Sequence, residues 1–190
     1  HLQPLTSQEV QHFFGRQTSR EEMLRYLMVF GGIPKYLEQI DPQKSFFQNL
    51  DELCFQKNGF FVEEFETLFK EQFKITKTYG DVVRILAQRS CSRQFLSNKL
   101  KLTAGGGVSG YLKNLENAGF IKTFCSQSPK GTSSKTRRIY LWDEWLRLFL
   151  TYMEPHKDVI QHNERYGLFE RVISKGFETY CGLAFERLCL

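Results

Sequence analysis

The sequence predicts a mainly α-helical protein with a winged helix-turn-helix, including a small β-hairpin, at its centre. Apolar residues recur every three to four positions along most of the chain, which is the spacing of amphipathic helices. Near the middle, three such stretches precede two β-rich segments, 120–124 and 138–142, which flank a polar loop. Three helices followed by a hairpin are typical of a winged helix. The complete fold class is therefore a helical bundle, this winged helix and C-terminal linker helices.

Residues 1–77 are predicted to form the helical bundle. Four places carry a helix-start signal, which is either capping-box spacing or a proline at the first helical position. These places are Thr6 to Glu9, Ser19 to Glu22, Pro34 and Asp41-Pro42. The second helix is expected to stop at Gly31-Gly32, and Asn58-Gly59 predicts a turn. An apolar stripe from Phe61 to Phe73 predicts one more helix.

Residues 78–142 are predicted to form the winged helix. A first helix is expected over 79–86, a second begins after a Ser92 cap, and a third covers 108–115. Gly105, Gly106 and Gly107 permit the turn before the third helix, and Gly119 is expected to end it in the left-handed conformation. The loop of the hairpin is expected over 126–136.

Residues 143–190 are predicted to be linker helices. Asp143 caps the first of them, and Glu154-Pro155 is expected to end it. The helical pattern then continues to Leu190 without a stop signal. A pattern cut in this way predicts that the parent protein continues, so we expect the chain to be a fragment.

The composition argues against several functional classes. Five cysteines, scattered and without a CxxC pair, favour reduced thiols in a cytoplasmic protein over a disulfide framework or a zinc site. No apolar run approaches the roughly 20 residues of a membrane span, so no membrane partner is expected. The four histidines have no metal-ligand spacing, and no nucleophile arrangement is visible. We therefore expect this chain by itself to be no enzyme and to hold no metal or cofactor.

Charge is distributed very unevenly along the chain. Between Val82 and Leu141 there are eleven Lys and Arg and one acid, Glu116, a balance of +10, whereas the whole chain carries +5. Such an asymmetry predicts a surface for a polyanion on the central segment. An ordinary solvated basic face is the alternative interpretation.

Winged helices bind DNA by placing the third helix in the major groove and the hairpin against the backbone. The third helix is expected to present Ser109, Lys113 and Asn114, of which the last two are the candidate base readers. Two base readers predict weak sequence specificity. The other candidate contacts are basic side chains that would grip phosphates, on the second helix and the wing: Arg93, Lys99, Lys130, Lys135, Arg137 and Arg138.

One stretch is specific enough to suggest a family. Gly31 to Glu38 resembles the GGxPxYL segment in the helical lid of prokaryotic AAA-type ATPases, often called archaeal-type ATPases, which are related to the signal-transducing NTPases. In that family a winged helix follows the lid, and a domain resembling PD-(D/E)xK nucleases follows the winged helix. The segments 79–86, 111–121 and 138–143 are similar to the family's winged-helix pattern, and Gly182 to Glu186 resembles the start of the nuclease-like domain.

The resemblance implies a set of roles. Gly32 and Pro34 would pack against the adenine of a nucleotide held by an ATPase core that lies upstream and is absent from this chain. ATP and magnesium are accordingly expected for the parent protein. Glu186 resembles the first acid of the nuclease motif, whose partner residues are not in this chain.

The function expected from these observations is a DNA-binding arm of an AAA-type ATPase, presented according to the nucleotide state of the core. Two alternatives stay open. The winged helix could instead dock on the ATPase core and hold it inactive, or the chain could be a free-standing transcriptional regulator, since a fold does not determine a function.

Overall fold

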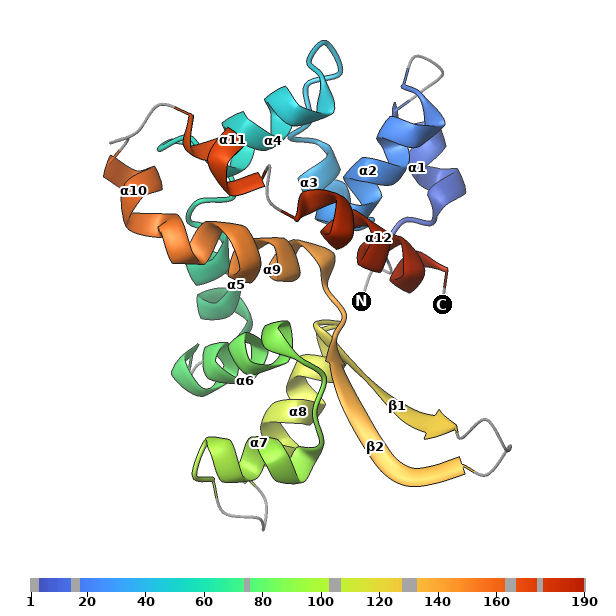
Figure 1. The fold of residues 1–190 in the computed structure, drawn as a ribbon, viewed down its shortest axis with the longest axis vertical. Helices are drawn as coiled ribbons and strands as arrows, with labels where there is room; N and C mark the ends of the chain where they lie inside the picture. The colour runs from blue at the N-terminus through green and yellow to red at the C-terminus, as the bar shows by residue number, and fades with distance from the viewer. Residues whose placement is uncertain are drawn as a thin grey trace. The chain divides into compact units, whose positions relative to one another are not determined.

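The computed structural model describes residues 4–14, 18–73, 76–102, 107–127, 133–162, 167–173 and 176–189. The described chain is mainly helical with one two-stranded antiparallel sheet, which confirms the expected class at that level (Figure 1). It divides into two compact units, which we describe separately. Unit 1 comprises His1–Glu64 and Thr151–Leu190, and unit 2 comprises Phe65–Leu150. The domain boundaries expected from the sequence, 1–77, 78–142 and 143–190, stay a prediction.

The first half of unit 1 is a set of short helices with well-defined starts. Thr6 and Glu9 form the expected capping box, and the hydroxyl of Ser19 accepts from the backbone N–H of Glu22. Gly31 ends the second helix with φ of +66°, a conformation that favours glycine. The elements are α1 (Ser7–Phe14), α2 (Arg20–Phe30), α3 (Pro34–Leu37) and α4 (Phe46–Cys54).

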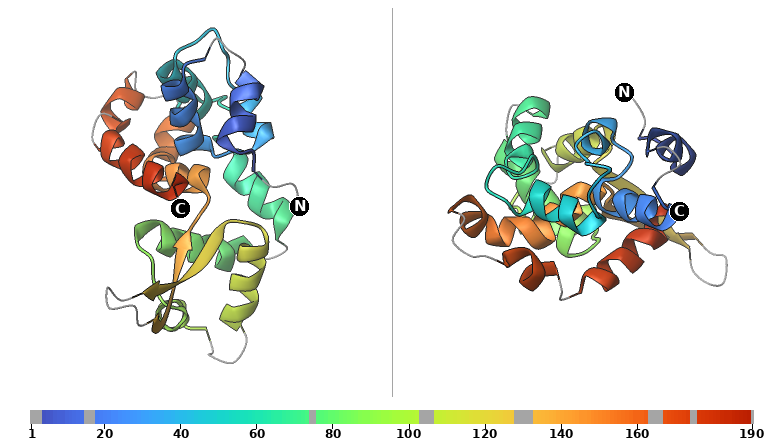
Figure 2. Two further views of the ribbon diagram at one scale, coloured as in Figure 1. Left: turned by 90° about the vertical axis from the view of Figure 1, so that its right-hand side faces the viewer. Right: turned by 90° about the horizontal axis from the view of Figure 1, so that it is seen from above.

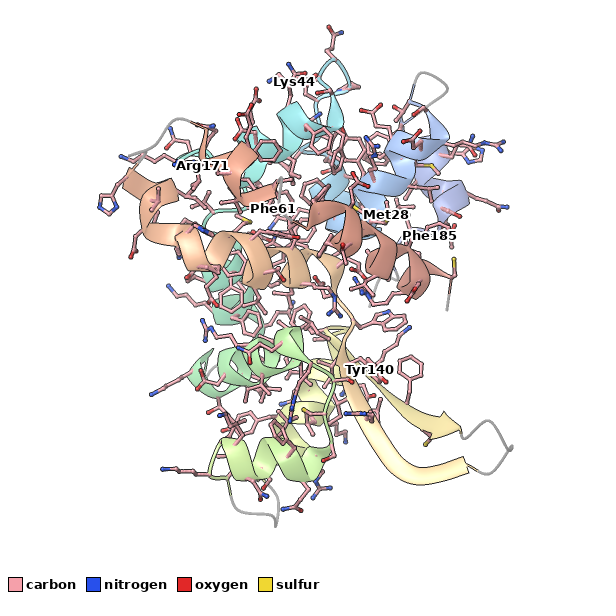
Figure 3. All side chains as sticks on the ribbon, viewed as in Figure 1. Met28, Lys44, Phe61, Tyr140, Arg171 and Phe185 are labelled. Carbon is pink, nitrogen blue, oxygen red and sulfur yellow. The ribbon has the colours of Figure 1, made fainter. Side chains whose placement is uncertain are left out.

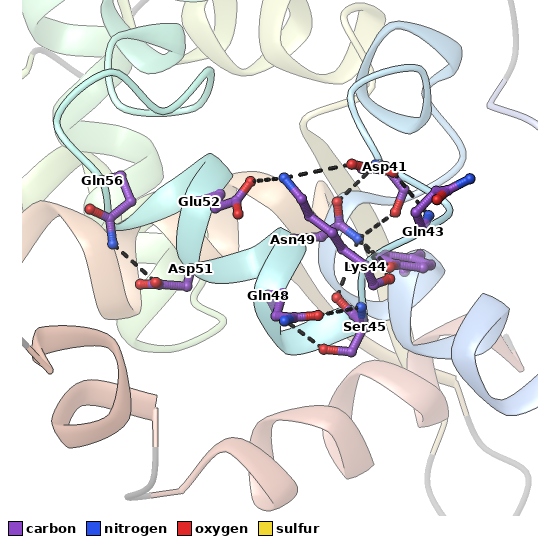
Figure 4. A network of polar contacts seen from close by, with 10 residues as sticks. Asp41, Gln43, Lys44, Ser45, Gln48, Asn49, Asp51, Glu52 and Gln56 are labelled. Carbon is purple, nitrogen blue, oxygen red and sulfur yellow. Dashed lines mark hydrogen bonds and ion pairs between the residues drawn. The ribbon is translucent and has the colours of Figure 1, made fainter.

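The expected helix start at Asp41-Pro42 is wrong. Helix α4 begins after Ser45, whose side chain forms a reciprocal capping box with Gln48 (Figure 4). Asp41 instead accepts from the backbone N–H of Gln43 at 2.9 Å, which closes a turn before the helix. The helix begins after Ser45 because its capping box satisfies two backbone donors. In addition, Asn49 stabilises the preceding turn by bonding to both the N–H and the C=O of Asp41.

The second half of unit 1 packs on the first. Tyr180 donates to the carbonyl of Met28 on α2 at 3.4 Å, and Phe177 lies 6.0 Å from Phe46 between ring centroids. Phe185, on the same helix, is exposed (Figure 3). The elements are η1 (Phe149–Met153), which begins in unit 2 and enters unit 1 at Thr151, η2 (Glu154–His156), α10 (Lys157–His162), α11 (Leu168–Ile173) and α12 (Phe177–Leu188).

The helix after Asp143 does not end at Glu154-Pro155 as expected. Asp143 caps α9 (Glu144–Leu148), and the backbone continues as the π-helix η1 and the 3-10 helix η2 into α10. Proline has no N–H to donate, and the first turn of a new helical type is a position where none is needed. Glu154-Pro155 therefore marks a change of helix type.

Unit 2 contains three consecutive helices followed by a hairpin, in the order expected from the sequence (Figures 1 and 2). Helix α8 contacts α6, α7 and the first strand, whereas the second strand contacts α6 and α7. Buried Leu86, Leu96 and Leu115 supply one apolar residue from each helix. The elements are α5 (Glu64–Gln72), α6 (Thr76–Gln88), α7 (Arg93–Lys99), α8 (Gly107–Asn117), β1 (Ile121–Gln127), β2 (Ser133–Leu141) and α9.

The hairpin is antiparallel, with Ile121 opposite Leu141 and Thr123 opposite Ile139. Both strands are longer than expected, and an irregularity interrupts their register between Cys125 and Gln127. At its base, Ile121, Ile139 and Leu141 are buried on the face turned to the helices. Across the described residues of both units, no helix is long and apolar enough to span a bilayer.

Candidate nucleic-acid interface

Local bonds at both ends of α7 fix how the chain enters and leaves this helix. The hydroxyl of Ser92 accepts from the N–H of Phe95 at 3.2 Å, which confirms the expected cap. After the helix, Ser97 donates through its hydroxyl to the carbonyl of Leu102 at 2.7 Å, and Lys101 adopts φ of +52°. The chain therefore leaves α7 in a defined direction. Gly105 and Gly106, the first two glycines of the expected turn, lie outside the described residues, and Gly107 is the first residue of α8.

One face of α8 is exposed and the opposite face is in the core. Val108, Leu112 and Leu115 are buried, with the spacing of a helix packed on one side. The exposed residues of the helix include no apolar side chain and are Gly107, Gly110, Lys113, Asn114, Glu116 and Asn117. Ser109, a predicted contact, is half-buried between the two faces.

The two predicted base readers on α8 differ in their surroundings. Asn114 donates to the hydroxyl of Tyr79 on α6 at 2.6 Å. Tyr79 itself is buried, stacked on Phe73 at 3.9 Å and against the edge of Tyr111 at 4.8 Å. The amide of Asn114 thus takes part in holding α8 on α6, whereas Lys113 is exposed at the surface.

The remaining predicted phosphate contacts lie on α7 and on the hairpin. Arg93 and Lys99 are exposed near opposite ends of α7, and Arg137 is exposed on β2. Arg138 is also exposed, and its guanidinium donates to the carbonyl of Ser90 at 3.3 Å. Two of the predicted contacts cannot be located: Lys130 is outside the described residues, and Lys135 is in β2 with its side chain outside them.

Unit 2 also contains cations and aromatic rings that the sequence did not predict as DNA contacts. The guanidinium of Arg89 lies 4.3 Å from the ring centroid of Phe95, and the ammonium of Lys122 lies 3.8 Å from that of Trp142. These distances are those of cation–π contacts. Lys122 and Trp142 have a signal in the sequence, because period-2 alternation places them on one face of the hairpin, whereas Arg89 has none.

The electrostatic field is positive at the isolated β-bridge between Cys91 and Ile139. Burial raises the pKa of the Cys91 thiol, and the nearby charges of Arg89 and Arg138 oppose part of that shift. Two guanidinium groups therefore act on the same point beside the second strand.

The segment Gly31 to Glu38, on which the family resemblance rests, belongs to unit 1. Gly32 is buried and its carbonyl accepts from the N–H of Leu5 at 2.7 Å. A Cβ at Gly32 would lie 2.2 Å from the carbonyl oxygen of Leu5, so glycine is required by this crossing. Pro34 is half-buried at the start of α3, and the neighbouring Lys35 forms a 3.0 Å ion pair with buried Glu64.

Comparisons with known proteins do not add a family to this description. No protein-family model matches the chain, and no similar protein was found among the curated proteins or the solved structures. Within the described ranges, no three His, Cys, Asp or Glu side chains are grouped as metal ligands.

Proposed function

We propose that unit 2 is a winged helix-turn-helix that binds duplex DNA with weak sequence specificity. In this arrangement α8 lies in the major groove, Lys113 faces the base edges, and Lys99, Arg93 and Arg137 neutralise phosphates. The observation that carries the proposal is the collection of exposed basic side chains on α7, α8 and β2 within one compact unit. That unit contains the segment with a charge balance of +10.

The exposed face of α8 supports both parts of this proposal. A Cβ added at Gly107 or Gly110 would meet nothing within 4 Å, so a groove can approach the helix backbone closely there. Because the amide of Asn114 bonds to Tyr79, base reading depends mainly on Lys113. One reader gives little discrimination between sequences, so affinity comes chiefly from phosphates and counterion release.

The segment from Gly31 to Glu38, which resembles the lid of AAA-type ATPases, extends the proposal to the parent protein. We infer that the chain is the DNA-binding arm of an AAA-type ATPase, and that nucleotide in the upstream core changes how unit 2 is presented. The parent protein should then bind DNA with different affinity in its ATP-bound and nucleotide-free states. Equal affinity in both states would remove this coupling and leave the DNA binding of unit 2 intact.

A salt series on labelled duplex DNA tests the central proposal. Binding of the unaltered chain should weaken steeply between about 50 and 200 mM salt, because each phosphate that the chain neutralises contributes about 0.9 to the downward slope of log affinity against log salt. The variant Lys99→Ala/Lys113→Ala/Arg137→Ala should bind more weakly and lose up to about 1.8 from that slope, because two of its three altered residues are proposed phosphate contacts.

A matched control removes three exposed basic residues from unit 1, as Arg20→Ala/Lys57→Ala/Arg171→Ala. It has the same net charge as the test variant and should keep the original slope. Equal losses in the two variants would show that only total charge matters. Binding that does not change with salt, or that is absent at about 50 mM salt, would contradict the proposal.

A further inference from the structure

The outer face of the hairpin is aromatic where a one-sided sheet usually exposes polar residues. Residues two apart on a strand share a face, and Lys122 is opposite Tyr140 while Phe124 is opposite Arg138. Trp142, directly after β2, continues the face. Its backbone N–H donates to the carbonyl of Phe120. Three rings and two cations therefore follow one another along a single surface.

The rings of this face are close together and one of them is well exposed. The centroid of Phe124 lies 5.6 Å from that of Tyr140, at an interplanar angle of 79°, and 5.5 Å from that of Trp142, at 46°. Phe124 keeps 39% of its surface exposed, while Tyr140 and Trp142 are half-buried. Tyr140 is on the hairpin near its base (Figure 3). The Phe124 ring thus packs beside Tyr140 and Trp142, and part of it is exposed to solvent.

Two cations lie beside the rings. The ammonium of Lys122 lies 3.8 Å from the ring centroid of Trp142, and exposed Arg138 is directly opposite Phe124 in the register. The single acid of the segment 82–141, Glu116, accepts from the N–H of Thr123 at 3.2 Å. Its carboxylate is thereby bound to the backbone at the base of the hairpin.

We propose that this aromatic face, which consists of Lys122, Phe124, Arg138, Tyr140 and Trp142, binds an unpaired nucleic-acid strand by stacking a base on Phe124. An exposed ring beside cations fits a base attached to a phosphate, and stacking accepts every base because each has a flat π-face. An acidic protein partner would also match the cations, so the open ring of Phe124 is the feature that favours a base. The inference rests on the proposed binding of DNA by unit 2 and specifies its substrate as duplex DNA next to a single-stranded stretch.

Three probes separate stacking from charge. The first is a blunt duplex, the second has the same duplex with a single-stranded tail of thymidines, and the third has an abasic tail of equal length. The two tails carry the same phosphates, so a difference between them reports on bases alone. One stacked base changes affinity by roughly 5- to 150-fold. We expect the unaltered chain to bind the thymidine tail about tenfold more tightly than the abasic tail.

Variants connect that difference to the ring. Phe124→Ala should abolish the preference for the thymidine tail and leave blunt-duplex affinity nearly unchanged, whereas Phe124→Tyr should retain the preference. Phe13→Ala is a matched control, because Phe13 is 41% exposed and belongs to unit 1, and it should change neither. If Phe124→Ala does not fold, the comparison of tails on the unaltered chain still decides the question.

The outcomes distinguish this inference from the proposed function. Equal affinity for the two tails would overturn the stacking site, and the aromatic face would then be a candidate surface for a protein. If blunt duplex is bound in a salt-dependent way at the same time, the proposed function stands without it. A chain that binds none of the three probes would overturn both.

Discussion

Asn114 on α8 donates a hydrogen bond of 2.6 Å to the hydroxyl of Tyr79 on α6. Both residues were expected on these helices, and Asn114 is exposed on α8, as expected for a candidate base reader. The bond also connects the two helices through a ring that is buried between Phe73 and Tyr111. The position of α8 relative to α6 therefore depends partly on a side chain that the sequence suggested for DNA.

Asn114→Ala should affect stability more than sequence preference. Loss of one hydrogen bond to a partly buried hydroxyl should lower the free energy of unfolding by about 1 kcal/mol. Discrimination between DNA sequences should hardly change, whereas Lys113→Ala should weaken binding and remove most of the weak sequence preference. Urea denaturation and binding to a panel of duplexes measure the two effects. A large shift in base preference on Asn114→Ala would mean that the amide leaves Tyr79 in the complex.

Gly110→Ala should stabilise the protein. Gly110 is an exposed position inside α8, and a Cβ there would meet nothing within 4 Å. Alanine is favoured over glycine in a helix interior by about 1 kcal/mol, so urea denaturation should show a gain of up to that size. Under the proposed function, the same variant should bind duplex DNA more weakly, because its methyl group reduces the approach of the groove to the helix. A gain in both stability and affinity would argue against close approach at this position.

Gly32→Ala should have the opposite effect on stability. The added Cβ would lie within 3.0 Å of three backbone atoms of Leu5, so the N-terminal segment has to move. Forced overlap in a packed region costs about 1–3 kcal/mol, and the loss of the bond from the N–H of Leu5 to the carbonyl of Gly32 would add to it. Thermal unfolding compared with Gly182→Ala, an open position on α12, measures the effect. Equal melting temperatures would contradict the crossing.

Asn49→Leu should destabilise unit 1 strongly. The buried amide of Asn49 bonds to the Tyr26 hydroxyl at 3.0 Å and to backbone groups of Asp41, Lys44 and Ser45 (Figure 4). A leucine has a similar volume and would leave several buried polar groups without their partner, each at a cost of about 1–3 kcal/mol. We expect a loss of roughly 3 kcal/mol or more by urea denaturation. Gln56→Leu, which removes an exposed bond to Asp51, is the control and should change stability by less than about 1 kcal/mol.

Asp143 should make stability depend on pH. Burial raises the pKa of its carboxyl group from 3.8 to about 6, although the N–H of Leu146 and the charge of Arg147 oppose the shift. A raised pKa means that the folded state holds the proton more tightly than the unfolded chain. The resulting stabilisation is complete below about pH 3.8 and is lost as the pH rises through about 6.

Asp143→Asn isolates this effect, because asparagine can cap α9 and does not titrate in this range. Unfolding free energies should favour Asp143 by about 1 kcal/mol more at about pH 5 than at about pH 7, relative to the asparagine variant. Asp143→Ala should be about 1 kcal/mol less stable than Asp143→Asn at both pH values, since the cap itself is removed. If the unaltered chain and the Asp143→Asn variant differ by a constant amount across this range, the raised pKa is contradicted.

The helix boundaries that the sequence predicted correctly all depend on neighbours in the chain. Ser19, Ser92 and Asp143 cap helices through bonds to an N–H three residues later, and Gly119 has the expected positive φ of +82°. The expected helix start at Asp41 is wrong because Ser45 caps α4 instead. Asn49, eight residues after Asp41, holds Asp41 in the turn that precedes the helix.

By itself, the sequence determined the helical class, the order of three helices and a hairpin in unit 2, and the basic charge of its central segment. Caps, turns and periodicity act over a few residues, so they can be read along the chain. The tertiary structure alone decided that Asn114 bonds to Tyr79 at a separation of 35 residues, that Leu5 crosses Gly32, and that Tyr180 reaches Met28 at a separation of 152. It also decided which face of the hairpin is open. Such contacts depend on which surfaces meet when the core packs, and packing between distant residues leaves no local pattern in the sequence.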